Sequence, residues 1–282
     1  MPHVLVTGAT GGIGRAIAEE FAARGAVLTL TDRHHDALQN AATRLRVPTV
    51  ALPADLGAPD APATLVEDAW AAHGPVDVLV NAAGLYPSLD MAELEASSWD
   101  RLFAVNLRAP VLATAAFARL ATARGRPGSV VNISSGAALR ARPGGGPYAS
   151  SKAALEMATR AAALELGAHG IRVNAVSPGF IPVDSDCNPV SEEYARAVGA
   201  NPLGRPGHPR DIARAVCWIA GPEASWVTGE VLRVDGGSGT GAAFLPRIWE
   251  PGDPAPSPDP NPAGPATPAA RTTSATTEGR PR

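Results

Sequence analysis

The chain has 282 residues, and its 27 acidic and 24 basic side chains give a formal net charge of −3. This length can bury the core of one large α/β domain or two small ones, and a near-neutral charge gives no basic footprint for nucleic acid. Two cysteines, Cys187 and Cys217, exclude a disulfide framework and favour a reducing, cytoplasmic compartment. Among the basic residues, Lys152 is the only lysine.

The ends of the chain bear on localisation and domain organisation. No basic segment followed by an apolar one opens the sequence, so no signal peptide is expected. No apolar stretch reaches the roughly 20 residues of a membrane span, and we predict a soluble protein. Residues 1–240 are predicted to form the folded domain. Residues 241–282 are rich in Pro, Ala, Ser and Thr, which predicts a mostly disordered tail, clearest over 250–282.

Short apolar runs alternate with longer amphipathic stretches throughout residues 1–240. Runs rich in Val, Ile and Leu predict seven buried strands: Val4–Thr7, Val27–Thr31, Thr49–Leu52, Val76–Val80, Ser129–Ile133, Arg172–Val176 and Val231–Val234. Helical periodicity predicts the intervening helices: Ile13–Arg24, Asp36–Leu45, Ala61–His73, Ser98–Arg124, Tyr148–Ala168 and Pro209–Ala220. This alternation predicts an α/β fold, a doubly wound parallel sheet (Rossmann fold) of about seven strands with helices on both faces.

A glycine-rich turn joins the first predicted strand to the first predicted helix. Gly8, Gly12 and Gly14 would let the backbone turn tightly and approach a pyrophosphate. The free N–H groups and the dipole at the helix N-terminus would attract the same anion. Because the turn lies directly between a strand and a helix, nucleotide binding is favoured over a purely structural role.

Asp32 stands at the end of the second predicted strand. A carboxylate there can accept hydrogen bonds from both hydroxyls of an adenosine ribose, and it would repel a 2′-phosphate. The neighbouring Arg33 could bind that phosphate instead, although a solvent-facing role fits it better. We therefore predict NAD in preference to NADP. Asp55, after the third strand, could bind the adenine amino group or simply cap a helix.

Tyr148 and Lys152 have i, i+4 spacing at the start of a predicted helix, which puts a phenol and an ammonium on one face. A neighbouring cation favours phenolate, so we expect Lys152 and a positive nicotinamide ring to lower the pKa of Tyr148 from about 10. Tyr148 would then be the general base in alcohol oxidation and the general acid in ketone reduction. A surface pair without function is the less favoured interpretation.

Segments in a fixed order over residues 1–237 resemble the short-chain dehydrogenase/reductase family. The matching segments are Thr7–Gly14 (TGATGGIG), Asn81–Gly84 (NAAG), Asn132–Gly136 (NISSG), Tyr148–Lys152 (YASSK), Asn174–Gly179 (NAVSPG), Asn201–Ala213 and Thr228–Gly237. The resemblance implies an oxidoreductase that transfers a hydride between a nicotinamide cofactor and a secondary alcohol or ketone. It also implies a homodimer or homotetramer formed through the long middle helices.

The same resemblance implies roles for individual residues. Ser135 would hold and polarise the substrate oxygen, with Ser134 packing on the other side of the strand. Asn106 would hold a water that links Lys152 to a proton relay. Besides Gly8, Gly12, Gly14, Asp32, Arg33 and Asp55, the cofactor would contact Ile13, Leu56, Asn81, Ala82, Gly84, Tyr148, Lys152, Pro178, Gly179 and Ile181.

One position departs from the family pattern. Val183 stands where threonine is common and hydrogen-bonds the cofactor. Asp184 or Ser185 could replace that contact, or it is lost. The six histidines are scattered along the chain, so no metal site is predicted.

The substrate is left open by the sequence. The loops at 85–90, 136–147 and 180–200 are expected to set specificity, because they follow the carboxyl ends of strands. Leu85, Tyr86, Phe180 and Tyr194 suggest an apolar pocket. Arg140 and Arg142 could meet an acidic group, although solvent-exposed arginines are expected in so Arg-rich a chain.

Two other functions stay open. One is an NADPH-dependent reductase of 3-oxoacyl thioesters or polyketides, with which Asn201–Ala213 is compatible and the carboxylate of Asp32 is not. The other is a dinucleotide sensor without turnover. Loss of Tyr148, Lys152 or Ser135 would favour such a sensor, and all three are present.

Overall fold

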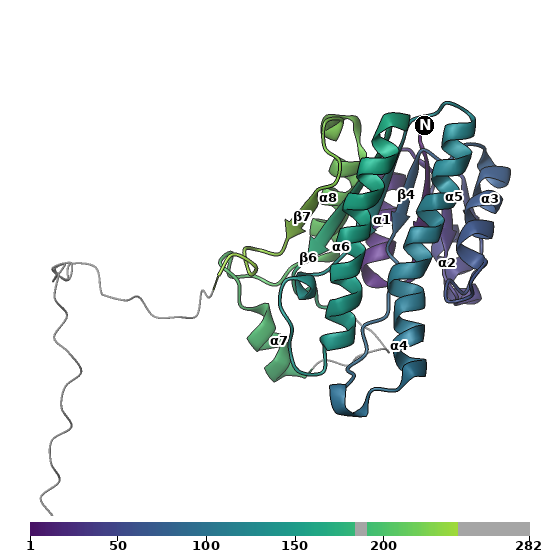
Figure 1. The fold of residues 1–282 in the computed structure, drawn as a ribbon. Coiled ribbons are helices and arrows are strands. Elements are labelled where there is room, and N and C mark those ends of the chain that lie inside the picture. The colour runs from purple at the N-terminus through teal and green to yellow at the C-terminus, as the bar shows by residue number, and fades with distance from the viewer. Residues whose placement is uncertain (184–190, 242–282) are drawn as a thin grey trace, which may run out of the picture. The chain divides into compact units, whose positions relative to one another are not determined.

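The computed structural model describes residues 1–183 and 191–241 (Figure 1). One seven-stranded sheet has the order β3-β2-β1-β4-β5-β6-β7, and each neighbouring pair is parallel. The strands are β1 (His3–Thr7), β2 (Val27–Thr31), β3 (Thr49–Ala51), β4 (Val78–Asn81), β5 (Gly128–Ile133), β6 (Ile171–Pro178) and β7 (Val231–Val234). The predicted doubly wound parallel sheet is thereby confirmed, and its strand order reverses between β1 and β4. Ligands of such sheets bind at the carboxyl ends of the strands beside this reversal.

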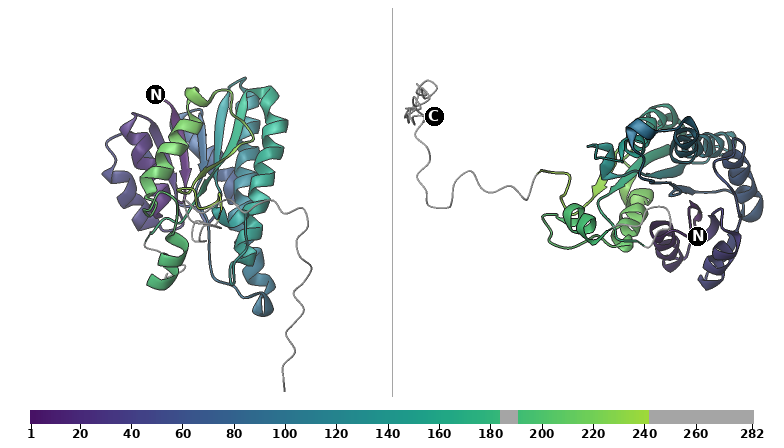
Figure 2. Two further views of the ribbon diagram at one scale, coloured as in Figure 1. Left: turned by 90° about the vertical axis from the view of Figure 1, so that its left-hand side faces the viewer. Right: turned by 90° about the horizontal axis from the view of Figure 1, so that it is seen from below.

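Helices cover both faces of the sheet (Figure 2). They are α1 (Gly12–Ala23), α2 (His35–Arg44), α3 (Ala61–His73), α4 (Ala96–Phe103), α5 (Ala109–Ala123), α6 (Gly146–Leu166), α7 (Glu192–Gly199) and α8 (Pro209–Ala220). Apolar side chains of α1, α2 and α8 pack on one face, and those of α3, α5 and α6 pack on the other. No helix within the described ranges is long and apolar enough to cross a membrane.

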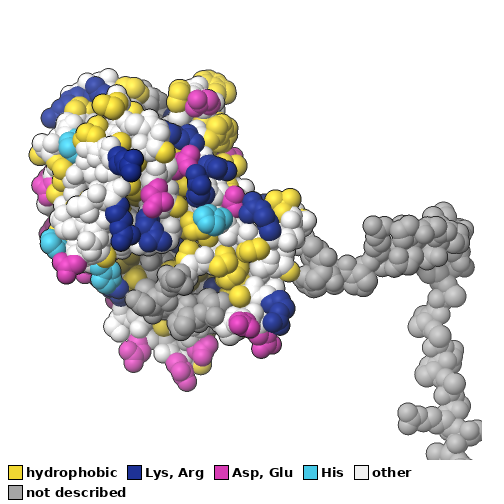
Figure 3. All heavy atoms as spheres, turned by 180° about the vertical axis from the view of Figure 1, so that it is seen from behind, with side chains coloured by type: hydrophobic (Ala, Val, Ile, Leu, Met, Phe, Trp, Pro, Cys, Tyr) yellow, Lys and Arg dark blue, Asp and Glu magenta, His cyan; other side chains and the backbone are white. Residues whose placement is uncertain are grey.

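The central strands carry apolar side chains on both of their faces because both faces are covered. In β1, Val4 and Val6 pack with the α1 and α8 layer, whereas Leu5 packs with the α3 and α5 layer. Successive side chains of a strand point to opposite faces, so a strand buried on both sides reads as a continuous apolar run. Figure 3 shows basic side chains interspersed with acidic ones over one face of the molecule.

The long helix predicted over Ser98–Arg124 is interrupted. A π-helical turn at Ala104–Arg108 separates α4 from α5. Pro110 lies in the first turn of α5 and has no N–H to donate to the carbonyl of Asn106, four residues earlier. Loss of that bond explains why the regular helix gives way to a wider turn, a distortion common at functional sites. The prediction of one uninterrupted helix was wrong at this point.

A second difference lies in the predicted loop 180–200, which contains the helix α7. The hydroxyl of Ser191 accepts a hydrogen bond from Tyr194 N at 3.2 Å and caps this helix. Ser followed by two acidic residues is a helix-start signal that the prediction overlooked. The predicted tail beyond Gly241, together with Asp184, Ser185 and Cys187, lies outside the described residues.

Candidate active site

The predicted site residues gather at the carboxyl edge of the sheet. The glycine turn follows β1, Asn81–Gly84 spans the end of β4, Ser135 follows β5 and Gly179 follows β6. Tyr148 and Lys152 reach the same edge from the first turns of α6. The parallel arrangement therefore brings together segments that are far apart in the sequence.

The glycine turn after β1 leaves no room for side chains. Gly8 has a φ of +67°, and a Cβ there would lie 2.7 Å from the Cα of Ala83. A Cβ on Gly14 would collide with the carbonyl oxygen of Gly8. Arg15 N donates the first helical hydrogen bond, to Gly11 O at 2.9 Å, so the N–H groups of Gly12–Gly14 precede it at the positive end of α1. This cradle fits a pyrophosphate, and Ile13 packs its side chain into the core beneath it.

Asp32 lies at the end of β2 beside this turn. Its Oδ2 accepts a hydrogen bond from Thr10 Oγ1 at 2.7 Å and one from Thr10 N at 3.3 Å, and its Oδ1 accepts one from His34 N at 3.3 Å. These bonds fix the carboxylate at the edge of the glycine turn and leave some of its acceptor capacity free. The Arg33 side chain is exposed, and its Nε donates to His34 Nε2 at 3.1 Å.

Val183 reaches the same turn from the segment after β6. A Cβ added to Gly12 would lie 2.5 Å from Cγ1 of Val183, so the two residues are in contact. Valine can pack on the glycine backbone but has no group that donates or accepts a hydrogen bond. The side chain of Ile181 in the same segment packs into the core layer of α1 and α8.

Tyr148 is half-buried near the N-terminus of α6. Burial raises its pKa above the usual value, while a hydrogen bond with Ser135 and the positive charge of Arg142 oppose that rise. The ammonium of Lys152 lies 5.9 Å from the centre of the Tyr148 ring. The lowered pKa expected for Tyr148 is therefore not found in the protein alone, because burial outweighs the charges around the phenol.

Lys152 is only 4% exposed. Its Nζ donates a hydrogen bond to the carbonyl of Ile133, at the end of β5, at 2.8 Å. A Cβ on Gly84 would lie 3.6 Å from this nitrogen, so the segment after β4 passes directly beside the ammonium. Burial lowers the pKa of Lys152 to about 8, which brings its proton within reach of chemistry near neutral pH.

Asn106 lies in the π-helical turn and is buried. Its amide pairs with both backbone groups of Leu85, accepting from the N–H and donating to the carbonyl at 2.8 Å each. Nδ2 also donates to Ser151 Oγ at 3.1 Å, and that hydroxyl donates to the carbonyl of Tyr148 at 2.7 Å. Asn106 thus ties the loop after β4 to the turn of α6 that carries Tyr148.

Several residues expected at the cofactor have side chains that are committed to the fold. Asn81 Nδ2 donates to Asn132 Oδ1 at 2.9 Å, and Asn132 Nδ2 donates to Thr159 Oγ1 at 2.9 Å, which joins β4, β5 and α6 through buried amides. Leu56 packs in the core layer of α3 and α5. The amide nitrogen of Asn81 and the side chain of Leu56 are therefore committed to the fold.

The two serines that follow β5 have different surroundings. Ser134 is buried and donates to the carboxylate of Glu156 at 2.7 Å, so it packs inside the protein. Ser135 bonds to Tyr148, and its hydroxyl also accepts from Ala137 N at 3.2 Å. Gly179, the first residue after β6, is fixed by the bond from its N–H to Val234 O at 3.1 Å.

Thr7, to which the sequence analysis gave no role of its own, fixes the position of the glycine turn. Thr7 is buried, and its hydroxyl accepts hydrogen bonds from the N–H groups of Ala82 and Ala83 at 3.0 Å each, which locks the glycine turn to the segment after β4. Its place at the start of the glycine motif was the available signal.

Asp55 is exposed and forms a 3.0 Å ion pair with Arg101, which lowers the pKa of the carboxyl.

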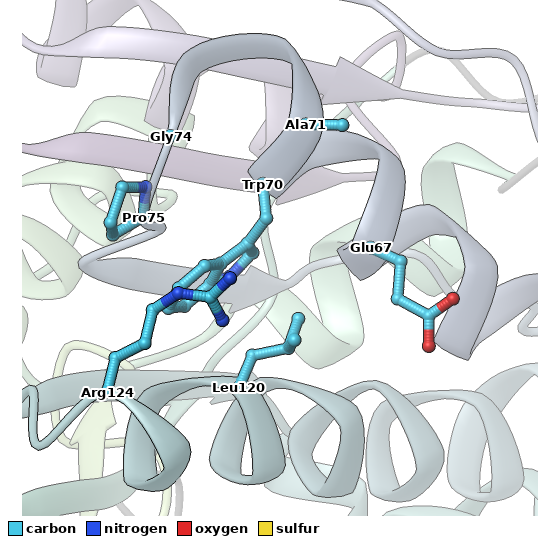
Figure 4. Close-up of a pocket in the computed structure, with 7 residues that line it drawn as sticks. All are labelled: Glu67, Trp70, Ala71, Gly74, Pro75, Leu120 and Arg124. Carbon is cyan, nitrogen blue, oxygen red and sulfur yellow. The ribbon is translucent and has the colours of Figure 1, made fainter.

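A hollow of about 290 Å³ lies between α3 and α5 (Figure 4). The guanidinium of Arg124 stacks over the indole of Trp70, 4.9 Å from the ring centre. Gly74 and Pro75 border the hollow and precede β4, so it lies at the amino edge of the sheet, away from Tyr148 and the glycine turn. No group of His, Cys, Asp and Glu side chains within residues 1–183 and 191–241 is arranged to hold a metal ion.

Comparisons with known proteins agree with this geometry. Residues 8–239 match the family model described as enoyl-(acyl carrier protein) reductase. Galactitol 2-dehydrogenase (L-tagatose-forming) of Cereibacter sphaeroides is 38% identical over 237 residues, which cover 82% of this chain and 92% of that protein. The (3R)-3-hydroxyacyl-CoA dehydrogenase of Mus musculus is 36% identical over 244 residues, 83% of this chain and 94% of that protein.

Solved structures give the same result. A short-chain dehydrogenase/reductase family protein has a TM-score of 0.74 and 39% identity, over 85% of this chain and 97% of that one. A blue fluorescent protein from a metagenomic library, in complex with NADPH, has a TM-score of 0.76 and 38% identity, over 84% of this chain and 97% of that one. The chain therefore belongs to the short-chain dehydrogenase/reductase family and is a nicotinamide-dependent oxidoreductase of alcohols and ketones.

Proposed function

We propose that Tyr148 exchanges the proton on the substrate oxygen, that Ser135 holds this oxygen, and that the ammonium of Lys152 assists the proton exchange. The hydrogen-bonded pair of Tyr148 and Ser135, with the buried ammonium of Lys152 beside it, carries this proposal. The glycine turn, Asn81, Ala82, Gly84, Pro178, Gly179 and Ile181 would contact the cofactor, mainly through backbone groups. Bound there, a nicotinamide dinucleotide supplies or accepts a hydride at the substrate carbon.

The pKa shifts of Tyr148 and Lys152 indicate how the proton would move between them and the substrate. In ketone reduction, the Tyr148 hydroxyl donates its proton to the substrate oxygen while Ser135 donates a hydrogen bond to it, and the raised pKa keeps the phenol protonated beforehand. Lys152, with a pKa of about 8, can return a proton to Tyr148 near neutral pH. Asn106 holds the turn of Tyr148 in place, and its backbone carbonyl, which Pro110 leaves without its helical donor, would hold the relay water.

We propose NAD as the preferred cofactor. Support comes from the Asp32 carboxylate, which is fixed by Thr10 and His34 at the end of β2, where it would meet the ribose hydroxyls. A 2′-phosphate beside that carboxylate would be repelled, whereas the exposed Arg33 donates to a neighbouring histidine. Asp55 is a weaker candidate for an adenine contact because its Oδ1 is already shared by Arg101 and the N–H of Gly57.

The proposal is tested with Tyr148→Phe, measured against a panel of ketones and secondary alcohols with NADH, NADPH and their oxidised forms. Turnover should fall by about a thousandfold, because the proton donor is gone. NADH affinity, followed by quenching of protein fluorescence, should stay within about threefold. A Tyr148→Phe enzyme that retains turnover would contradict the mechanism. A preference of the unaltered enzyme for NADPH, unchanged in Asp32→Ser, would contradict the cofactor assignment.

We also propose a homo-oligomer and a cytoplasmic location. Four large apolar side chains on α5 and α6, which lie side by side in Figure 1, are exposed: Val111, Leu112, Met157 and Leu164. Burial against a second copy would remove this apolar surface from water. Light scattering should then give a multiple of the chain mass, and Leu164→Arg should lower it. The buried, unpaired thiol of Cys217 is in keeping with a reducing compartment.

A further inference from the structure

Arg142 lies in the loop between β5 and α6, six residues before Tyr148. Its side chain folds back over Gly145, where an added Cβ would lie 2.8 Å from Cγ and 3.1 Å from Nε. Gly145 caps α6, and its N–H donates to the carbonyl of Arg142 at 3.0 Å. The loop is also tied to the segment after β4, because Leu89 N donates to Gly144 O at 2.8 Å. The arginine is thus held at the rim of the proposed active site.

The surroundings of Arg142 differ from those of the five described arginines that form ion pairs. Arg24, Arg101, Arg126, Arg160 and Arg205 each face a carboxylate. Arg140, two residues earlier in the same loop, donates to Ser238 O at 3.1 Å. Within the described ranges, Arg142 has neither an acidic partner nor a carbonyl acceptor, and its guanidinium stacks 5.1 Å above the Tyr194 ring. Its charge still reaches the catalytic phenol, since it lowers the pKa of Tyr148.

Tyr194, from α7, contributes a second unmet group. Its hydroxyl is shielded from solvent and has no hydrogen-bond partner among the described residues. A buried hydroxyl without a partner costs free energy that a suitable ligand oxygen would recover. The ring of Tyr86 lies 6.4 Å from that of Tyr148 in an edge-to-face arrangement. The guanidinium that acts on the phenol of Tyr148 therefore lies against a tyrosine whose hydroxyl has no partner among the described residues.

We infer that the substrate carries a carboxylate near its reacting carbon, bound by Arg142 with the Tyr194 hydroxyl as a second donor. The inference rests on the proposed function, because it places the reacting carbon at Tyr148. Guanidinium groups match the two oxygens of a carboxylate in a planar, paired geometry. A phosphate group carries close to two charges and would need a second cation, whereas Arg140 is already bonded to Ser238. The substrate class is therefore a short hydroxy acid or the matching oxo acid.

The test compares each acid with its own methyl ester, which keeps the reacting carbon and removes the charge. A series of 2- and 3-hydroxy acids and their esters is assayed for oxidation with NAD and NADP. For the best acid, kcat/KM should exceed that of its ester by at least about tenfold. Arg142→Gln should remove this difference by lowering the value for the acid alone. Tyr194→Phe, which keeps the ring under the guanidinium, should lower it about fivefold.

Arg196, an exposed arginine on α7, provides the matched control. Arg196→Gln removes the same charge from the same region and should leave acid and ester rates unchanged. Equal activity on acid and ester, turnover of neutral alcohols only, or an equal loss on both in Arg142→Gln would each overturn the inference while leaving the proposed function intact. Failure to oxidise or reduce any alcohol or ketone with either cofactor would overturn both.

Discussion

Two cations at opposite edges of the sheet, a half-buried arginine and a buried lysine, differ in how many hydrogen bonds they donate. Arg172, at the amino end of β6, donates to four carbonyls at the end of α8 and just beyond it: Ile219, Ala220 and Gly221 at 2.8, 2.8 and 3.1 Å, and Val227 at 3.1 Å. Lys152, at the carboxyl edge, donates to one carbonyl, that of Ile133. Burial lowers the pKa of both groups.

This difference separates a structural charge from a chemical one. Both terminal nitrogens of the Arg172 guanidinium are used by four carbonyls, and those at the end of α8 need donors because the helix supplies none. An ammonium has three donors, so Lys152 retains hydrogen-bonding capacity that the described residues do not use. Its burial costs stability without matching bonds, as expected of a group kept for function. This difference in role can be tested by exchanging each cation for an apolar side chain of similar length.

The largest effect is expected for Lys152→Met. Turnover should fall by on the order of a hundredfold or more, because the proton route to Tyr148 and the charge beneath the cofactor are both lost. The melting temperature should stay the same or rise, since methionine fills the space without burying a charge. Steady-state kinetics and thermal unfolding check the two parts. A large fall in melting temperature would mean that Lys152 holds the fold together as Arg172 does.

The reciprocal variant, Arg172→Met, should behave in the opposite way. It leaves four carbonyls without their donor, which should lower the free energy of unfolding by about 2 kcal/mol. The kcat of the folded enzyme should be unchanged, because Arg172 lies at the edge of the sheet away from Tyr148. Urea unfolding and the rate per active site measure these two quantities. Loss of kcat without loss of stability would contradict the assignment of a structural role to Arg172.

A smaller effect is expected on the free energy of unfolding when the pH is lowered, and it arises from His3 at the amino edge of the sheet. Burial lowers the pKa of His3, whose Nε2 lies 2.9 Å from the Thr29 hydroxyl and whose Nδ1 lies 3.0 Å from Gly74 O. Because the unfolded chain takes up this proton first, stability is complete above pH 6.5 and is lost as the pH falls below it. The loss should be roughly 1 kcal/mol per unit of pKa difference.

His3→Gln isolates this contribution, because glutamine does not titrate. The variant should be less stable than the unaltered protein at pH 7, and the difference should shrink between pH 7 and pH 5. Unfolding by urea at several pH values provides the measurement. A constant difference across that range would show that His3 has the same pKa in both states.

The sequence was sufficient for the layers of the fold and for the residues that meet at the carboxyl edge. Continuous apolar runs identify strands covered on both sides, and the i, i+4 spacing of Tyr148 and Lys152 places them on one helix face. Quantities that depend on burial were not predictable. The pKa of Tyr148 is raised because desolvation outweighs the nearby charges, and its size depends on packing by distant segments.

Local irregularities were missed for a related reason. The π-helical turn at Ala104–Arg108 needs both the missing N–H of Pro110 and the anchoring of Asn106 to Leu85, and only the proline is visible in the helical pattern. Arg172 reads as one of many arginines until α8 and the start of β6 are side by side. Such contacts join residues that are far apart in the chain, so periodicity carries no signal of them.

The smallest effect is expected from removing residues 250–282, which we propose are not needed for the fold or for the chemistry. The family match ends at residue 239 and the last strand at Val234, so the chemistry and the sheet are complete before this segment. Its composition, poor in large apolar side chains, offers little surface to bury. Truncation after Trp249 should therefore leave kcat/KM unchanged and shift the melting temperature by less than about 2 °C. Because both edges remain in the truncated enzyme, Lys152→Met and Arg172→Met should have the same effects there as in the full chain. A truncated enzyme that loses activity or changes its oligomeric mass would mean that the tail acts on one of the two edges, and the two variants would identify which.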